Sequence, residues 1–170
     1  TARHQLQPTT IRDFSVEQEI RSVISMCQPT ARQHQVKLSL ASKSGAHITG
    51  DPVKFNQLVA NLIVNAIEAY PPAAVETVSQ PRRVEIRHYR YRAQTAITVQ
   101  DFGPGVPADL RESIFEPFTT SKPRSGKNTG IGLTLVKRYV EQDFQGRLRL
   151  TTSRSGTCFR IYFPAGSKQH

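Results

Sequence analysis

Apolar residues recur at the helical period in three segments of the chain, and the first of these lies near its start. Ser15, with Gln18 three residues later, has the pattern of a helix-capping box. The apolar positions that follow predict a helix that runs to about Gln33. Pro29 lies inside this segment, where a proline either kinks a helix or ends it early. Residues 1–14 show no such period, and we expect them to be extended or irregular.

The second helical segment has the strongest pattern in the chain. Asp51 is an acidic N-cap candidate, and Pro52 suits the first helical position. The apolar residues that follow at helical spacing are Phe55, Leu58, Val59, Leu62, Ile63, Ala66 and Ile67. Pro71 and Pro72 stop this pattern. A third helix is predicted over about 132–142.

Short alternation of polar and apolar residues predicts strands. The segments that alternate are 36–41, 83–91, 95–100, 147–151 and 157–163. The second and third of these are separated by a short link and predict a β-hairpin, and the last two are joined near Gly156. Interleaved helices and strands of this kind predict an α/β sandwich, in which about three helices cover one face of a mixed sheet.

Composition limits the class of protein. A chain of 170 residues with 37% hydrophobic and 21% charged residues is one soluble domain. It holds no apolar run long enough to span a membrane, and it has no apolar signal segment at its start. Cys27 and Cys158 fit no metal or redox spacing, which favours a reducing compartment without excluding a disulfide.

The net charge of +10 is concentrated in three parts of the chain. Arginines crowd residues 82–92, cations without acids occupy 122–127, and the chain from Phe144 onward contains basic residues but no Asp or Glu. Such a surface attracts polyanions in general. No zinc-finger or aromatic RNA-binding signature accompanies the charge, so a nucleic-acid partner is not expected.

Polar residues on the second helix are the first chemical candidates. Asn61 and Asn65 are four residues apart and share one helical face. By themselves they also fit ordinary polar residues on the surface of a helix. Their amide oxygens, with Glu68 nearby, suit a hard cation such as Mg²⁺ beside phosphate oxygens.

The irregular segment 101–129 is long enough to be functional. Asp101 ends a strand and is followed by Gly103 and Gly105, which allow a tight turn and a close approach to a flat ligand. The same residues also fit a simple Asp-x-Gly turn. Further on, Phe115 and Phe118 either anchor a lid or are ordinary loop packing.

The segment before the third helix is the last candidate. Gly130-Ile131-Gly132-Leu133 opens that helix, where free N–H groups suit a phosphate. The cations just before it are Lys122, Arg124 and Lys127, which either meet a nucleotide tail or are solvated.

The order of these features is more specific than any one of them. The chain contains, in sequence, Asn-x-x-x-Asn-Ala, Asp-x-Gly-x-Gly, Phe-x-x-Phe, Gly-x-Gly-Leu and a final Ser155-Gly156-Thr157. From about Phe14 to Pro164 it resembles the ATP-binding catalytic domain of sensor histidine kinases, within the gyrase, Hsp90, histidine kinase and MutL ATPase superfamily. The resemblance implies a Bergerat-type two-layer sandwich with a flexible ATP lid. It also implies a domain at 15–165, with 1–14 as an extension from a dimerisation domain and 166–170 as a tail.

The resemblance implies a role for each box. Asn65 is the expected Mg²⁺ ligand, Asn61 supports phosphate or metal one turn earlier, and Asp101 reads the adenine amino group. The residues expected to contact the nucleotide as well are Glu68, Gly103, Gly105, Lys122, Arg124, Lys127, Gly130, Ile131, Gly132, Leu133 and Thr157. Lys122 is also a catalytic candidate, although which of the three lid cations meets the γ-phosphate stays open. Glu68 and Ala69 depart from the cation and aromatic that many members have at these positions.

Asn61 separates two branches of the superfamily. Gyrase-like and Hsp90-like members have a glutamate at this position, which activates water, whereas an amide cannot act as a general base. A histidine nucleophile needs less activation, because much of its imidazole is uncharged near neutral pH. Asn61 therefore favours a histidine kinase over a hydrolase.

The phosphoacceptor is expected elsewhere in the parent protein, because none of the five histidines here is followed by an acid. The resemblance thus predicts a cytoplasmic fragment, itself a monomer, of a homodimeric parent; whether the parent is anchored in the inner membrane stays open. It would bind ATP and Mg²⁺, phosphorylate its own dimerisation domain and serve a response-regulator receiver domain. The alternative is a catalytically silent ATP-binding or docking module of the same fold.

Overall fold

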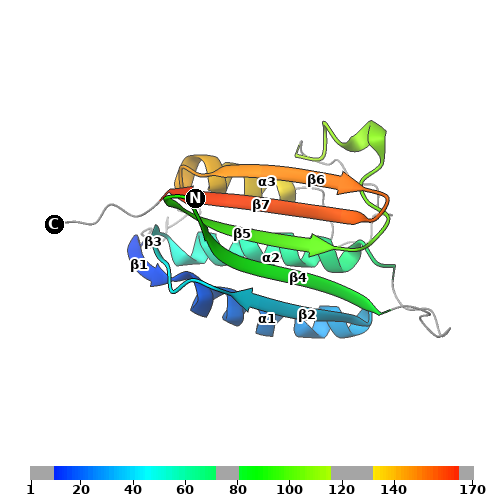
Figure 1. Ribbon diagram of the computed structural model, residues 1–170, viewed down its shortest axis with the longest axis horizontal. Helices are drawn as coiled ribbons and strands as arrows, with labels where there is room; N and C mark the ends of the chain where they lie inside the picture. Colours follow the sequence, from blue (N-terminus) through cyan, green and yellow to red (C-terminus); the bar gives the residue numbers. More distant parts are fainter. Residues whose placement is uncertain (1–9, 72–80, 116–131, 165–170) are drawn as a thin grey trace, which may run out of the picture.

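A five-stranded mixed sheet forms one layer of the protein (Figure 1). The computed structural model describes residues 10–71, 81–115 and 132–164. The strands lie in the order β2-β4-β5-β7-β6, with β2 parallel to β4 and the other pairs antiparallel. Their bounds are β2 Val36–Ser42, β4 Arg82–Tyr91, β5 Gln94–Asp101, β6 Arg147–Ser153 and β7 Gly156–Pro164. All five strands correspond to segments predicted from the sequence.

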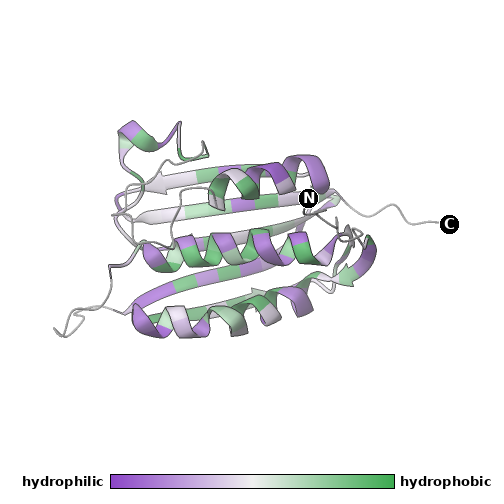
Figure 2. Ribbon diagram, turned by 180° about the vertical axis from the view of Figure 1, so that it is seen from behind, coloured by the Kyte–Doolittle hydropathy of each residue, from purple (hydrophilic) through white to green (hydrophobic). Residues whose placement is uncertain are grey.

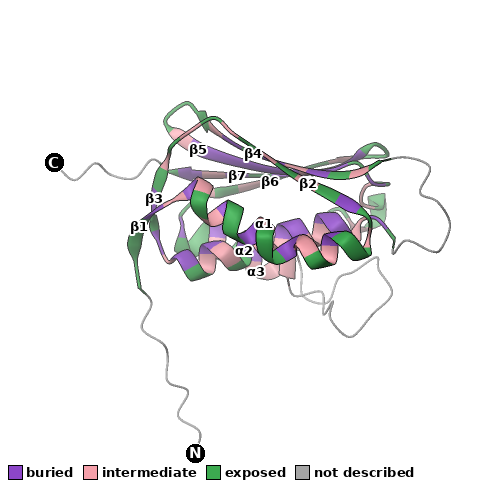
Figure 3. Cartoon of the chain, turned by 90° about the horizontal axis from the view of Figure 1, so that it is seen from below, coloured by how far each residue is buried: buried purple, intermediate pink, exposed green. Residues whose placement is uncertain are grey.

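The helices form the second layer, on one face of the sheet (Figure 3). They are α1 (Val16–Gln33), α2 (Pro52–Glu68) and α3 (Gly132–Arg138), and a short 3₁₀ turn, η1, occupies Ala108–Leu110. This arrangement confirms the predicted α/β sandwich. The lid segment lies outside the described residues.

Local capping explains where the two long helices begin. The Ser15 hydroxyl accepts a hydrogen bond from the backbone N–H of Gln18 at 3.3 Å, and the Asp51 carboxylate accepts one from Val53 at 2.8 Å. Pro29 does not end α1, which continues to Gln33.

Aromatic residues join the two layers. The ring of Phe55 on α2 lies 5.1 Å from that of Phe14 and 5.8 Å from that of Phe163 on β7. Phe144 packs edge-on against Phe163 at 5.4 Å. Figure 2, in which the helices lie in front of the sheet, shows hydrophobic and hydrophilic residues alternating along them. Because α2 supplies the central ring, its position is fixed against the sheet.

Two local features go beyond the sequence prediction. Residues 12–14, expected to be extended or irregular, are extended, because strand β1 (Arg12–Ser15) pairs with β3 (His47–Gly50), which was not predicted, in a separate antiparallel sheet. The expected third helix is also split, because α3 changes into a π-helical turn, η2, over Tyr139–Asp143. The lack of a side chain at Gly50 leaves the space that the Phe144 ring occupies after this turn.

Both cysteines are buried and free. Burial raises the pKa of the Cys27 and Cys158 thiols, so both are neutral at physiological pH. No helix within the described ranges has the length and apolar character needed to cross a membrane.

His88 is a fully buried histidine on β4. Its Nδ1 lies 3.2 Å from the Ser42 hydroxyl, and its Nε2 has no partner among the described residues. Burial lowers the pKa of His88, and the charge of Glu17 on α1 opposes this effect more weakly. The folded state therefore favours the neutral ring.

Protonation of His88 is expected to destabilise the fold as the pH falls. The unfolded chain takes up a proton near the ordinary histidine pKa of about 6.5, whereas the folded chain resists it until a lower pH. The contribution of the neutral His88 ring to the free energy of unfolding is therefore complete above about pH 6.5 and is lost below it. The free energy of unfolding, measured with denaturant between pH 7.5 and 5, should fall with decreasing pH less steeply for His88→Gln than for the wild type. The difference in slope should be up to about 1 kcal/mol per pH unit. Parallel slopes would show that His88 does not contribute.

Candidate functional site

The carboxylate of Asp101 lies at the end of β5 and is almost fully buried, with 2% of the residue exposed. Its Oδ1 accepts hydrogen bonds from the backbone N–H of Gly103 at 3.0 Å and of Thr157 at 3.3 Å. Gly103 and Thr157, both predicted site residues, are thus joined directly to Asp101. The position of the carboxylate is set by backbone groups of both the glycine loop and β7.

The glycine loop lies against the end of α2. A Cβ atom at Gly103 would lie 3.3 Å from the Ala69 side chain, which is tighter than an ordinary contact. Gly105 has a φ of +80°, and a side chain there would overlap the Ser153 carbonyl. Close approach and backbone conformation therefore require glycine at 105, and the space at Gly103 is tight for any side chain.

The start of β7 completes this region. Gly156 has a φ of +138°, and a Cβ there would overlap the carbonyl oxygen of Asp101. The hydroxyl of Thr157 lies 3.0 Å from that of Thr152, which accepts a hydrogen bond from the backbone N–H of Val106 at 2.9 Å. The β6–β7 hairpin is thus connected to the glycine loop at several points.

The polar face of α2 continues the site toward α3. Asn61, Asn65 and Glu68 are all partly buried. Gly132, the first residue of α3, lies against Asn61, and a Cβ at Gly132 would lie 3.2 Å from its Oδ1. The structure therefore brings Asn61 together with Gly132, and Leu133, the next residue of the predicted Gly-x-Gly-Leu segment, packs on the core.

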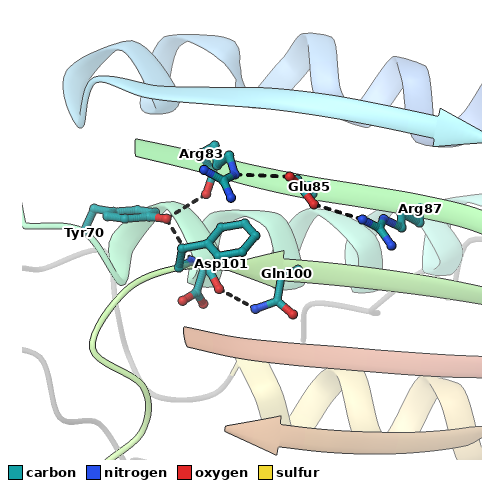
Figure 4. A network of polar contacts seen from close by, with 7 residues as sticks. Tyr70, Arg83, Glu85, Arg87, Gln100 and Asp101 are labelled. Carbon is teal, nitrogen blue, oxygen red and sulfur yellow. Dashed lines mark hydrogen bonds and ion pairs between the residues drawn. The ribbon is translucent and has the colours of Figure 1, made fainter. Parts of the chain in front are cut away.

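Tyr70 is a residue of this region that the sequence pattern did not single out. Its hydroxyl donates to the carbonyl of Arg83 at 2.7 Å and accepts from the backbone N–H of Phe102 at 2.8 Å (Figure 4). The Arg83 guanidinium lies 3.9 Å from the centre of the Phe102 ring. An aromatic residue just before Pro71 at a helix end was the only available signal in the sequence.

Phe115 is held against the core. Its ring packs edge-on to Phe159 at 6.2 Å, and its carbonyl accepts a hydrogen bond from the Thr134 hydroxyl at 2.6 Å. These contacts fit both interpretations of Phe115, as a lid anchor and as ordinary loop packing. The predicted residues Phe118, Lys122, Arg124, Lys127, Gly130 and Ile131 lie outside the described residues.

The donors present suit a cation shared with a ligand. Amide and carboxylate oxygens are the ligands that Mg²⁺ prefers, and this ion is commonly held by one or two protein groups together with phosphates. The described residues contain no group of three or more His, Cys, Asp or Glu side chains that could hold a metal. Asn61, Asn65 and Glu68 supply oxygens of this kind, which suit a cation that the oxygens of a ligand would complete.

Comparison with known families agrees with this geometry. Residues 50–167 match the model for the histidine kinase-, DNA gyrase B- and HSP90-like ATPases. The chain belongs to this family.

Its relatives are sensor histidine kinases. It is 32% identical over 130 residues to the C4-dicarboxylate transport sensor protein DctB of Rhizobium meliloti (strain 1021), a match that covers 76% of this chain and 19% of DctB. It is 31% identical over 117 residues to the sensory histidine kinase/phosphatase NtrB of Escherichia coli O157:H7, covering 67% of this chain and 32% of NtrB. The chain thus spans about a fifth to a third of these relatives.

The fold is that of a histidine kinase catalytic domain. The catalytic domain of the histidine kinase ThkA superposes with a TM-score of 0.76 at 22% identity, over 95% of this chain and 99% of that one. ThkA in complex with the response regulator TrrA also matches, with a TM-score of 0.72 at 20% identity, over 94% of this chain and 43% of that one.

The left-handed glycine at 156 is expected to be essential for stability. Gly156→Ala should lower the free energy of unfolding by about 2 kcal/mol or more, because the new methyl group overlaps the Asp101 carbonyl in an unfavourable backbone conformation. Gly45→Ala is the matched control, since a Cβ there meets nothing within 4 Å. Urea denaturation measures both; equal losses would show that the close approach at Gly156 is not maintained in solution.

Proposed function

We propose that this domain binds Mg-ATP and donates its γ-phosphoryl group to a histidine of a sensor histidine kinase. The single observation that carries the proposal is the buried Asp101 carboxylate, which two backbone N–H groups orient at the edge of the glycine loop. A carboxylate fixed in this way suits recognition of the adenine amino group, because its position is set before the ligand arrives. Gly103 and Gly105 form the adjoining floor.

The phosphate end of the site is proposed to lie along α2 and the start of α3. Asn65 would hold Mg²⁺, with Asn61 and Glu68 as supporting oxygens and Gly132 next to them. When bound, this cation neutralises charge on the phosphate oxygens. The cations Lys122, Arg124 and Lys127, with Gly130 and Ile131, are proposed to contact the phosphates from the adjoining segment.

The transfer step is proposed to use histidine rather than water as the nucleophile. The bond from the imidazole nitrogen to the γ-phosphorus forms as the bond to the β–γ bridging oxygen breaks, and ADP leaves with that electron pair. No carboxylate of the protein is needed to activate a neutral imidazole, which is consistent with an amide at Asn61.

The partners follow from the same proposal. The acceptor histidine would belong to the dimerisation domain of the parent protein, which we propose to be a homodimer with the catalytic domain in the cytoplasm. A response-regulator receiver domain would then take the phosphoryl group; the ThkA complex with TrrA supports this class of partner. The alternative is a catalytically silent ATP-binding or docking module of the same fold. The ATP titrations below distinguish a module that only docks, and phosphoryl transfer to the histidine of a dimerisation domain distinguishes one that only binds ATP.

Asp101→Asn is expected to weaken ATP binding about tenfold or more. Asparagine keeps one carbonyl oxygen for Gly103 and Thr157, but replaces the other oxygen by an NH₂ group that cannot accept from adenine. Calorimetric titration with a non-hydrolysable ATP analogue measures the change, and the exposed Asp109→Asn is the matched control. Unchanged affinity in a folded Asp101→Asn protein would contradict the adenine assignment.

Asn65→Ala is expected to remove the gain in ATP affinity that Mg²⁺ gives. The matched control is Asn56→Ala, because nine residues separate the two positions and place them on opposite sides of α2. Titrations with Mg²⁺ and with EDTA should differ for the wild type and for Asn56→Ala, but coincide for Asn65→Ala. A persistent Mg²⁺ effect in Asn65→Ala would move the cation elsewhere.

The isolated domain is expected to hydrolyse ATP very slowly, because Asn61 supplies no general base for water. A coupled phosphate-release assay at saturating Mg-ATP tests this. Rapid turnover without a histidine-bearing partner would favour the hydrolase branch of the family instead.

A further inference from the structure

The second face of the five-stranded sheet is open, because the helices of the described residues all lie on the other side (Figure 3). This open face is turned toward the viewer in Figure 1. Strand alternation and register place seven cations on it or at its margin. They are Lys37, Lys43, Arg83, Arg87, Arg147, Arg149 and Arg160. Glu85 is the one acidic residue that the described strands contribute to this face.

Three of these arginines lie in one row across the sheet. Arg87 pairs with Thr98, Thr98 with Arg160, and Arg160 with Arg149. Residues directly opposite on antiparallel strands share a face, and like charges in such pairs are destabilising. Neither β6 nor β7 contains an acid that would offset the Arg160–Arg149 pair. An anion between the strands would relieve this repulsion.

The row borders a hollow of about 770 Å³. Its lining includes three cations, Lys43, Arg87 and Arg160, and one acid, Glu85, which pairs with Arg87 at 3.3 Å. Cys158 also lines the hollow, and burial raises the pKa of its thiol, which therefore adds no negative charge to that of Glu85. Because the cations outnumber the one acid, the hollow suits carboxylates, which Lys43 and Arg160 can pair with.

Two aromatic residues of this face already have partners in the same chain. Arg83 lies over the Phe102 ring at 3.9 Å and Arg147 over the Tyr162 ring at 5.3 Å, and each arginine takes one of the two ring faces on which a base could stack. Phe102 and Tyr91 remain 39% and 42% exposed, so the test below includes a nucleic acid. Glu85 is paired with Arg83 at 3.1 Å and with Arg87 at 3.3 Å, so it opposes an acidic partner less than an unpaired carboxylate would.

We propose that the open face docks a carboxylate-rich segment of a partner protein, which Arg149, Arg160 and Lys43 bind through its acidic side chains. With strands about 4.8 Å apart, the row from Arg87 to Arg149 extends about 14 Å, the length of about four residues of extended peptide. This surface is separate from Asn61 and Asn65 on the helical side, so docking does not require the nucleotide-binding residues.

The test uses the whole chain and a fluorescein-labelled decaglutamate peptide, followed by fluorescence anisotropy at low salt. Arg149→Glu and Lys43→Glu are each expected to weaken binding about threefold to tenfold. Arg149→Glu also places an acid opposite Arg160, so this variant is expected to fold at least as well as the wild type. Arg32→Glu, an exposed charge reversal on α1, is the matched control and should change binding less than twofold.

Each outcome decides the proposal. Weaker peptide binding in Arg149→Glu and Lys43→Glu but not in Arg32→Glu, with unchanged thermal unfolding, supports the proposal. Equal loss in Arg32→Glu would show attraction by net charge alone and overturn it, as would no binding by the wild type. Tighter binding of a ten-nucleotide oligothymidylate, or of phosphatidylserine vesicles, that is lost in Arg149→Glu would assign the face to a nucleic acid or a membrane instead.

Discussion

A single buried carboxylate oxygen holds the functional end of the sheet together. Asp101 Oδ1 accepts from the glycine loop and from β7. A charged group removed from water is tolerated only when hydrogen bonds replace its hydration, so these two backbone donors are a condition for placing an acid there. Asp101 in turn positions the loop and the start of β7, because their backbone N–H groups donate to its carboxylate. The geometry of the proposed adenine site and the local stability of the fold therefore depend on the same contacts.

Much of the fold could be predicted because its strongest local signals agree with its tertiary packing. The caps at Ser15 and Asp51 and the apolar period of α2 identify both long helices, and alternation identifies all five strands of the main sheet. The site could be predicted as a set of boxes in a characteristic order. The contact between Asn61 and Gly132 could not, because it arises only when α2 and α3 pack together.

The features that sequence reasoning missed depend on distant partners. β1 and β3 are four residues each, too short for a clear period, and form because Phe14 and Ile48 are buried opposite one another. The π-helical turn after α3 follows from where Phe144 can be buried, beside Gly50. Tyr70 has no local signature, since its hydroxyl matters only through Arg83 and Phe102.

The bridge made by Tyr70 has a mechanical consequence. The last directly paired residues of β4 and β5 are Val84 and Asp101, and the hydroxyl joins the two strands just beyond them. Since Tyr70 follows α2 directly, the helix that carries Asn61 also sets where this end of the sheet opens. With a rise of about 1.5 Å per residue, Asn61 and Ala69 are about 12 Å apart along the axis. The helix thus keeps the distance between the two ends of the site fixed. If it slid along its axis, both ends would move together and their spacing would not change.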